Sequence, residues 1–337
     1  MSARRIPSLD GLRAISIAMV VLGHMARWGH ISPVVPQYAG SLGVRIFFVL
    51  SGYLITGLLL QEYDRTATVS LRNFYIRRAF RIFPAAFAFF ICVGILYWRQ
   101  ISWYHMAAAF LYVANMDDTR PWIFGHLWSL GIEEQFYLLW PWAVKKWHNH
   151  RAAILIGASL ATPIFHAGLY ALKIRGGITG SLPVFADQLA IGCLLAVFAS
   201  RLPKVSKSLA LGMFVAVILI SYFPGNTPLR TLFNLFLLQP LVNISVAGLV
   251  LHVIQSPYRW LNWGPVSWLG RISYSLYLWQ ELFCSNRTIH FGYSLIVPAL
   301  LCATLSYYVI EQPMLRLRDR ITRPKAAQPI AASAAAA

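Results

Sequence analysis

Residues 8–25, SLDGLRAISIAMVVLGHM, decide the fold class of this chain. From Ala14 to Met25 the stretch is apolar apart from one serine, one glycine and one histidine. A helix needs roughly 20 mostly apolar residues to cross the ~30 Å hydrocarbon core of a bilayer. Stretches of this kind recur along the sequence. We predict ten membrane spans, near residues 10–29, 41–61, 82–98, 126–144, 152–172, 184–200, 207–223, 231–254, 268–288 and 294–314.

The composition of the whole chain agrees with a membrane protein. Of its 337 residues, 58% are hydrophobic and 12% are charged, whereas about a quarter of the residues in a soluble domain are charged. We therefore predict an all-α fold, a polytopic membrane helical bundle at residues 1–320 with a disordered cytoplasmic tail at 321–337. The apolar segment 105–115 is too short to cross a bilayer, so we expect a re-entrant or interfacial helix there.

The net charge of +18 suits a nucleic acid, an anionic membrane surface or a topology signal. Lysines and arginines are retained on the cytoplasmic side of membrane proteins. With the N-terminus inside, 21 of the 29 cationic residues fall in alternate joints between spans, on one side. This bias predicts that both termini are cytoplasmic. It excludes a nucleic-acid binder, because the basic residues form no long soluble tract.

Ionisable side chains inside the predicted spans are the first functional candidates, because burying them in lipid is costly. Arg13 and His24 are eleven residues apart, which places them on one face of a helix and about 16 Å apart along its axis. A structural alternative is a capped helix start, with Arg13 extending to the membrane surface and His24 hydrogen-bonded to a neighbouring helix.

Two further candidates are a pair of arginines and a carboxylate. Arg78 and Arg81 are three residues apart, so they are neighbours on one helical face, and guanidinium groups suit phosphate oxygens. The alternative for this pair is a topology signal that also touches anionic lipid. Glu133 lies at a depth that we expect to match that of His24. The structural alternative is that Glu133 or Glu134 merely pairs with an arginine such as Arg45.

The segment GRISYSLYLWQE at 270–281 is the fourth candidate. Its hydroxyls and aromatic rings can line a cavity, and an interfacial aromatic belt explains the rings equally well.

Four pieces of sequence, in this order, resemble the acyltransferase 3 family of integral membrane acyltransferases. They are SLDGLRAISIAMVVLGH at 8–24, GVRIFFVLSGYLITGLLL at 43–60, RRAFRIFP at 77–84 and WSLGIEEQFYLLWP at 128–141. ISYSLYLW at 272–279 and IEQP at 310–313 extend the resemblance over roughly residues 8–318.

The resemblance implies a ten-span helical domain that passes an acyl group from cytoplasmic acyl-CoA to a hydroxyl, commonly on an externally facing sugar. It implies functional positions at Arg13 and His24, at Arg78 and Arg81, and at Glu133. Two positions depart from the family pattern. Arg45 stands where the family usually has aspartate, and Gln280 stands where a histidine is frequent. We give neither position a catalytic role.

We hypothesise that His24 is the base or the nucleophile of acyl transfer. Glu133 would orient its ring and stabilise its charged form, as a carboxylate does in a catalytic triad. Arg78 and Arg81 would bind the phosphates of the acyl-CoA co-substrate, for which acetyl-CoA is expected, and Arg13 would line the route of the thioester to His24.

The expected partners are acyl-CoA, membrane lipid, and a carbohydrate or glycolipid acceptor bound by the outer loops, chiefly 99–125 and 173–183. A metal is not expected, because the histidines lack ligand spacing such as HExxH. A bacterial cytoplasmic (inner) membrane is the expected location. The alternative function is a proton-coupled transporter or flippase of a sugar or lipid, which also uses buried His, Glu and Arg, although we find no related halves in the sequence.

Overall fold

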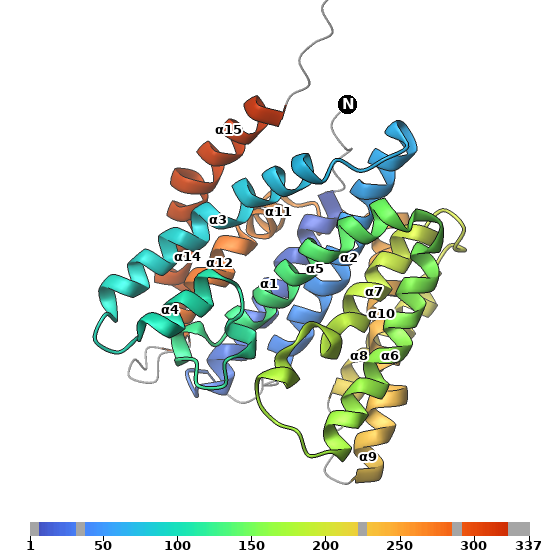
Figure 1. Cartoon of the computed structure of the whole chain (residues 1–337), viewed down its shortest axis with the longest axis horizontal. Coiled ribbons are helices and arrows are strands. Elements are labelled where there is room, and N and C mark those ends of the chain that lie inside the picture. Colours follow the sequence, from blue (N-terminus) through green and yellow to red (C-terminus); the bar gives the residue numbers. More distant parts are fainter. Residues whose placement is uncertain (1–6, 32–37, 222–227, 285–291, 323–337) are drawn as a thin grey trace, which may run out of the picture.

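The fold is described from a computed structural model, which covers residues 7–31, 38–221, 228–284 and 292–322 (Figure 1). Within these ranges the regular elements are all helical and no strand is present. The α-helices are α1 (Pro7–Arg27), α2 (Ala39–Thr66), α3 (Leu71–Leu96), α4 (Trp103–Phe110), α5 (Leu127–Lys146), α6 (Arg151–Ala171), α7 (Leu182–Phe198), α8 (Lys207–Ser221), α9 (Pro228–Phe233), α10 (Gln239–Gln255), α11 (Gly264–Arg271), α12 (Ser273–Trp279), α13 (Glu281–Cys284), α14 (Ile296–Leu305) and α15 (Gln312–Thr322). Short 3-10 turns and two π-helical segments, η5 (Asn234–Leu238) and η7 (Ser306–Glu311), join several of them.

Seven helical segments in the described ranges are long and apolar enough to cross a membrane, so the chain is a multi-pass membrane protein. They are Ser8–Arg27, Ala39–Thr66, Leu71–Leu96, His148–Ala171, Gly177–Phe198, Arg230–Gln255 and Gly292–Thr322. The other three predicted spans also fall on helices. α5 carries two glutamates and two lysines, α8 has 15 residues, and α11, α12 and α13 follow one another with breaks at Ile272 and Gln280. The helical bundle is therefore confirmed, with the number of crossings close to ten.

The two ends of the described chain lie at the same end of the bundle. The start of α1 and the end of α15 both point upward in Figure 1. Ile321 and Thr322, the first residues of the predicted tail, still belong to α15, and residues 323–337 lie outside the described ranges.

The short apolar segment near residue 105 forms α4, a helix of eight residues. At a rise of 1.5 Å per residue it extends only about 12 Å, far less than a bilayer. The prediction that it does not cross is therefore confirmed. The 3-10 turns η1 (Ala114–Met116) and η2 (Trp122–Phe124) connect it to α5.

The helices form two groups around a central set. α1, α2 and α5 occupy the middle of Figure 1, with α6, α7, α8 and α10 on one side and α3, α14 and α15 on the other. α2 and α7 approach closely because Gly52 and Gly192 face each other's helices. A Cβ added at Gly52 would lie 2.2 Å from the Leu189 carbonyl oxygen, and one added at Gly192 would lie 2.1 Å from that of Val49. Small residues bring membrane helices into such contact.

Candidate functional site

Five helices enclose a cavity at the centre of the bundle. Its empty volume, including the open mouth, is about 690 Å³. The lining residues are Arg13 on α1; Val44, Phe47, Phe48 and Ser51 on α2; Arg78, Arg81 and Ile82 on α3; Ser129, Leu130, Glu133 and Tyr137 on α5; and Ser273, Tyr274 and Tyr277 on α12. The structure thus brings four of the five predicted site residues to one cavity, and His24 lies outside its lining.

The cavity is positively charged because three guanidinium groups face it. Arg78 stacks on Tyr137, with 4.4 Å between its guanidinium carbon and the ring centroid. Among the described residues, neither Arg78 nor Arg81 has a carboxylate oxygen within 4.0 Å. Arg13 has a long contact of 3.5 Å to Asp10. Half-buried arginines without close carboxylates can bind an anion, and bidentate guanidinium groups suit phosphate.

Glu133 belongs to this cavity and to its own hydrogen-bond chain. It accepts a hydrogen bond from the Ser51 hydroxyl, and Ser51 accepts one from the Tyr137 hydroxyl at 3.1 Å. The positive charges of Arg78 and Arg13 also act on this carboxylate. Glu133 therefore offsets part of the positive charge in the cavity, and the structure does not join it to His24.

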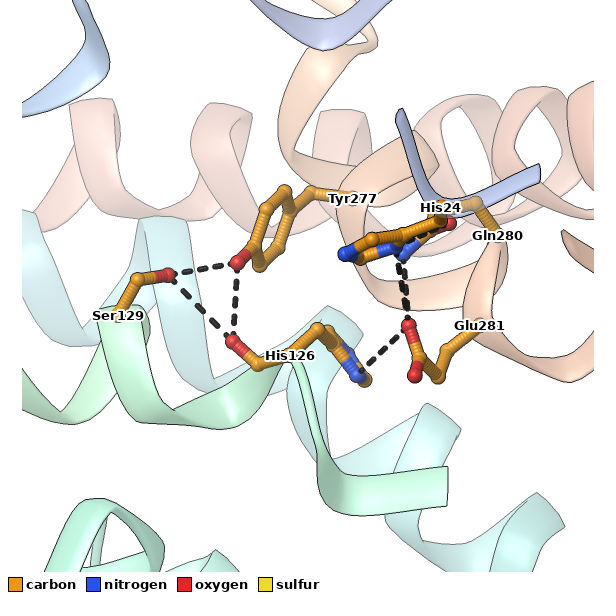
Figure 2. Close-up of polar contacts among 6 residues, drawn as sticks. All are labelled: His24, His126, Ser129, Tyr277, Gln280 and Glu281. Carbon is orange, nitrogen blue, oxygen red and sulfur yellow. Dashed lines mark hydrogen bonds and ion pairs between the residues drawn. The ribbon is translucent and has the colours of Figure 1, made fainter. Parts of the chain in front are cut away.

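His24 instead lies in a second polar cluster, at the other end of α1 (Figure 2). Its Nδ1 is 3.3 Å from Oε2 of Glu281 and 3.1 Å from Oε1 of Gln280. Gln280 in turn donates a hydrogen bond from Nε2 to Glu281 Oε2 at 3.0 Å. The carboxylate that holds the His24 ring is therefore Glu281, and the expected pairing of His24 with Glu133 is wrong.

The depth of His24 explains this correction. The prediction treated both helices as upright rods of equal length, so that His24 and Glu133 met halfway. In the structure His24 lies in the last turn of α1, level with His126 at the start of α5, because both histidines contact Glu281. Glu133 is seven residues further along α5, which is about 10 Å along the helix axis.

His126 completes the second cluster. Its ring is buried, and Nδ1 is 3.7 Å from Oε2 of Glu281. In the part of the chain that the structure describes, neither ring nitrogen of His126 has a hydrogen-bond partner. Its backbone carbonyl accepts a hydrogen bond from the Tyr277 hydroxyl at 2.9 Å, and Tyr277 is 2.6 Å from the Ser129 hydroxyl. Two histidines thus share one carboxylate beside the cavity.

Sequence reasoning missed Glu281 and gave Gln280 no role. The segment at 270–281 was expected to line a cavity or form an aromatic belt, and the cavity interpretation is correct for Ser273, Tyr274 and Tyr277. The signal for Glu281 was an acidic residue at the end of that apolar segment. Helical periodicity could not link Glu281 to His24, because α12 ends at Trp279 and the chain turns at Gln280.

Arg45, the other position that departs from the family pattern, forms a separate polar network. It donates hydrogen bonds to Asn243 at 2.7 Å and to the side chain of Gln239, both on α10. Asn243 donates to Asp187 on α7 at 2.6 Å, and the Asp187 carboxylate also attracts Arg45. The alternative in which Arg45 pairs with Glu133 is therefore wrong. This network ties α2 to α7 and α10.

The segment 99–125, which the sequence predicted as an outer loop, is held by its own polar contacts and reaches the second cluster. His105 Nδ1 is 2.8 Å from Asp117. Burial raises the pKa of Asp117, but hydrogen bonds from Thr119 and His105 outweigh it and hold that pKa below its ordinary value. At the end of the loop, a Cβ added at Gly125 would lie 3.3 Å from Glu281 Oε1. Among the described residues, no group of three His, Cys, Asp or Glu side chains is arranged to hold a metal ion.

A helical membrane bundle with a cationic cavity and a buried histidine–carboxylate pair defines a class of intramembrane enzyme or carrier. Comparison with known sequences decides within that class. The model of the acyltransferase 3 family, described as an acyltransferase domain, matches residues 6–310. This chain belongs to the acyltransferase 3 family. The match favours acyl transfer over the transporter or flippase that the buried charges also suggested.

Two relatives illustrate the similarity. The chain is 30% identical over 360 residues to O-acetyltransferase OatA of Staphylococcus aureus, covering 93% of this chain and 58% of the relative. It is 29% identical over 368 residues to peptidoglycan O-acetyltransferase OatA of Listeria monocytogenes, covering 93% of this chain and 56% of the relative. The chain thus spans little more than half the length of these relatives. No solved structure matches it.

Proposed function

We propose that this chain transfers an acyl group, with acetyl expected, from acyl-CoA to a hydroxyl of a cell-envelope carbohydrate. One observation carries the proposal. The cavity contains two arginines without a nearby carboxylate, and it lies beside His24, whose ring is held by a carboxylate and an amide. The first part fits the phosphates of a CoA thioester, and the second fits the chemistry of acyl transfer. The names of the relatives support peptidoglycan as the acceptor.

The donor would bind with its phosphates at Arg78 and Arg81 and its thioester directed toward His24. Arg13 lies along this route, and eleven residues of α1 separate it from His24, a distance of about 16 Å. The flexible pantetheine arm of CoA is long enough to cover that distance. In this arrangement the phosphates stay at the cytoplasmic end of the cavity while the acyl group reaches an acceptor on the other side.

The ring orientation of His24 supports a separate role for each of its nitrogens. Nδ1 faces the acceptor oxygens of Gln280 and Glu281, so it carries the proton and Nε2 has the free lone pair. Nε2 would take the proton of the acceptor hydroxyl as its oxygen attacks the thioester carbonyl carbon. The carbon–sulfur bond then breaks, and His24 returns the proton to the CoA thiolate. Glu281 would stabilise the imidazolium between these steps.

The test uses purified full-length chain in lipid nanodiscs with radiolabelled acetyl-CoA and peptidoglycan fragments. His24→Gln should lower label transfer to the glycan by roughly 100-fold or more, the usual contribution of a general base. The matched control is His166→Gln, on α6 and away from both clusters, which should keep the wild-type rate. Near wild-type transfer by His24→Gln would exclude His24 as the base. Label retained on the wild-type protein, and absent from His24→Gln, would show that His24 acts as a nucleophile.

A further inference from the structure

The cavity and the His24 cluster are separated by a single helical turn. A Cβ added at Gly40 would lie 3.9 Å from His24 Cδ2, so Gly40 belongs with the His24 cluster, as do His126 and Glu281. Each of these residues has a cavity-lining residue three or four positions away, about 5 Å along the helix axis. The pairs are Gly40 and Val44 on α2, His126 and Ser129 at the start of α5, and Glu281 and Tyr277 on the α12–α13 segment.

Hydrogen bonds join the residues that lie between the cavity and the His24 cluster. The Tyr277 hydroxyl donates to the His126 carbonyl at 2.9 Å and is 2.6 Å from the Ser129 hydroxyl. The Tyr277 ring stands against the His126 ring, with 5.4 Å between the centroids. Figure 2 shows the Tyr277 ring between Ser129 on one side and His24 on the other. Tyr277 is buried, so these bonds lie in a low-dielectric setting.

We propose that Tyr277 and Ser129 form a gate that separates the arginine-lined cavity from His24, and that the Tyr277 hydroxyl must leave the His126 carbonyl to admit the thioester. This inference rests on the proposed function for the identity of the group that passes. The carbonyl that holds the gate and the ring that contacts Glu281 belong to the same residue, His126. Opening the gate therefore disturbs the residue beside the His24 partner, which couples entry of the thioester to the site of reaction.

A closed gate also has a physical purpose. A cavity that ran through the bundle to His24 would connect the two sides of the membrane by a polar path. Closing an active site excludes water from reactive groups and prevents side reactions. A hydroxyl held by two hydrogen bonds can do this and still open, because each such bond contributes only about 0.5 to 1.5 kcal/mol net.

The test measures access to the cavity and needs no acyl-CoA. A result against the gate can therefore be distinguished from a result against the proposed function. The four native cysteines, Cys92, Cys193, Cys284 and Cys302, are replaced by alanine, and Ile82→Cys places a thiol in the cavity lining. A small charged methanethiosulfonate reagent is added to one side or the other of sealed vesicles that contain the oriented full chain. The modification rate is measured from each side.

We expect the parent to react far more slowly from the second side than from the first. Tyr277→Phe with Ser129→Ala should raise the rate from the second side roughly tenfold, because the lost hydrogen bonds favour opening. The matched control is Tyr274→Phe, which also removes a hydroxyl from the cavity lining. The Tyr274 hydroxyl donates to the Ile82 carbonyl at 2.9 Å, away from His126, so this variant should keep one-sided access. Tyr277→Ala, which removes the whole ring, sets the fully open rate. An unchanged rate from the first side shows that each variant is folded.

Two-sided access in the parent would overturn the proposal, because no gate would then be closed. One-sided access in Tyr277→Ala would overturn it too, since the ring would not be the barrier. A third outcome would also contradict the proposal: access stays one-sided in Tyr277→Phe with Ser129→Ala but becomes two-sided in Tyr277→Ala. The hydroxyls would then not hold the gate.

Discussion

Replacing Glu281 by glutamine tests which carboxylate serves His24. The substitution keeps the shape of the side chain and removes its negative charge, 3.3 Å from His24 Nδ1. At an effective dielectric constant of 20, two unit charges at that distance attract by about 5 kcal/mol. The amide dipole and the bond to Gln280 retain roughly half of this stabilisation. The remaining 2 to 3 kcal/mol corresponds to a loss of roughly 100-fold in kcat, at 1.36 kcal/mol for each tenfold change.

The assay compares kcat and KM for acetyl-CoA in Glu281→Gln and Glu133→Gln, with thermal unfolding as the check on folding. Glu133→Gln leaves the contacts of His24 intact, so its loss in kcat should be at least about tenfold smaller, by the same electrostatic argument. The reasoning is refuted if Glu133→Gln loses as much kcat as Glu281→Gln while both proteins unfold near the wild-type temperature. That result would show that Glu133 reaches His24 during the reaction.

Two further predictions concern the donor site and the helix packing. Arg78→Gln with Arg81→Gln should raise the KM for acetyl-CoA by roughly 100-fold or more, since charge-assisted bonds contribute about 1.5 to 3 kcal/mol each. Arg77→Gln, whose guanidinium pairs with Glu62 at 3.3 Å, should not raise it; an equal rise in the double variant and in Arg77→Gln would point to a general surface effect. Gly192→Ala should lower the unfolding temperature and Gly212→Ala, which has open space around it, should not. Equal unfolding temperatures in these two variants would contradict the close contact of α2 and α7.

The architecture could be predicted from sequence because it depends on length and polarity alone. Within the described residues, each predicted span falls on one helix or on successive helices, and the eight-residue α4 is too short to cross. The spacing of Arg78 and Arg81 predicted that they share a helix face, and both line the cavity. That Glu133 joins Arg13 and these arginines there, away from His24, was not predicted. The catalytic and binding roles of these residues remain predictions until the variants above are measured.

The partner of His24 could not be predicted, because it depends on helix tilt and on a break in the chain. Counting residues places a side chain along its own helix, but it does not give the height of one helix relative to another. An error of two turns separated His24 from Glu133. The turn at Gln280 then placed an amide and a carboxylate beside His24 from a segment 256 residues away in sequence. Such a break has no hydrophobic period that would reveal it.

The Arg45 network has a consequence for how the protein is made. Arg45 enters the membrane with the second helix, but Gln239 and Asn243 follow 194 and 198 residues later in the chain. A charged residue inside an inserting helix is costly, by up to about 2.5 to 3.5 kcal/mol at the helix centre. Arg45 lies in the second turn of α2, and nothing from α7 or α10 is yet present to offset its cost. During synthesis the apolar residues of α2 alone must hold that helix in the bilayer. Its final polar contacts form only when the tenth helix arrives, so the completion of an early membrane span waits for a late one.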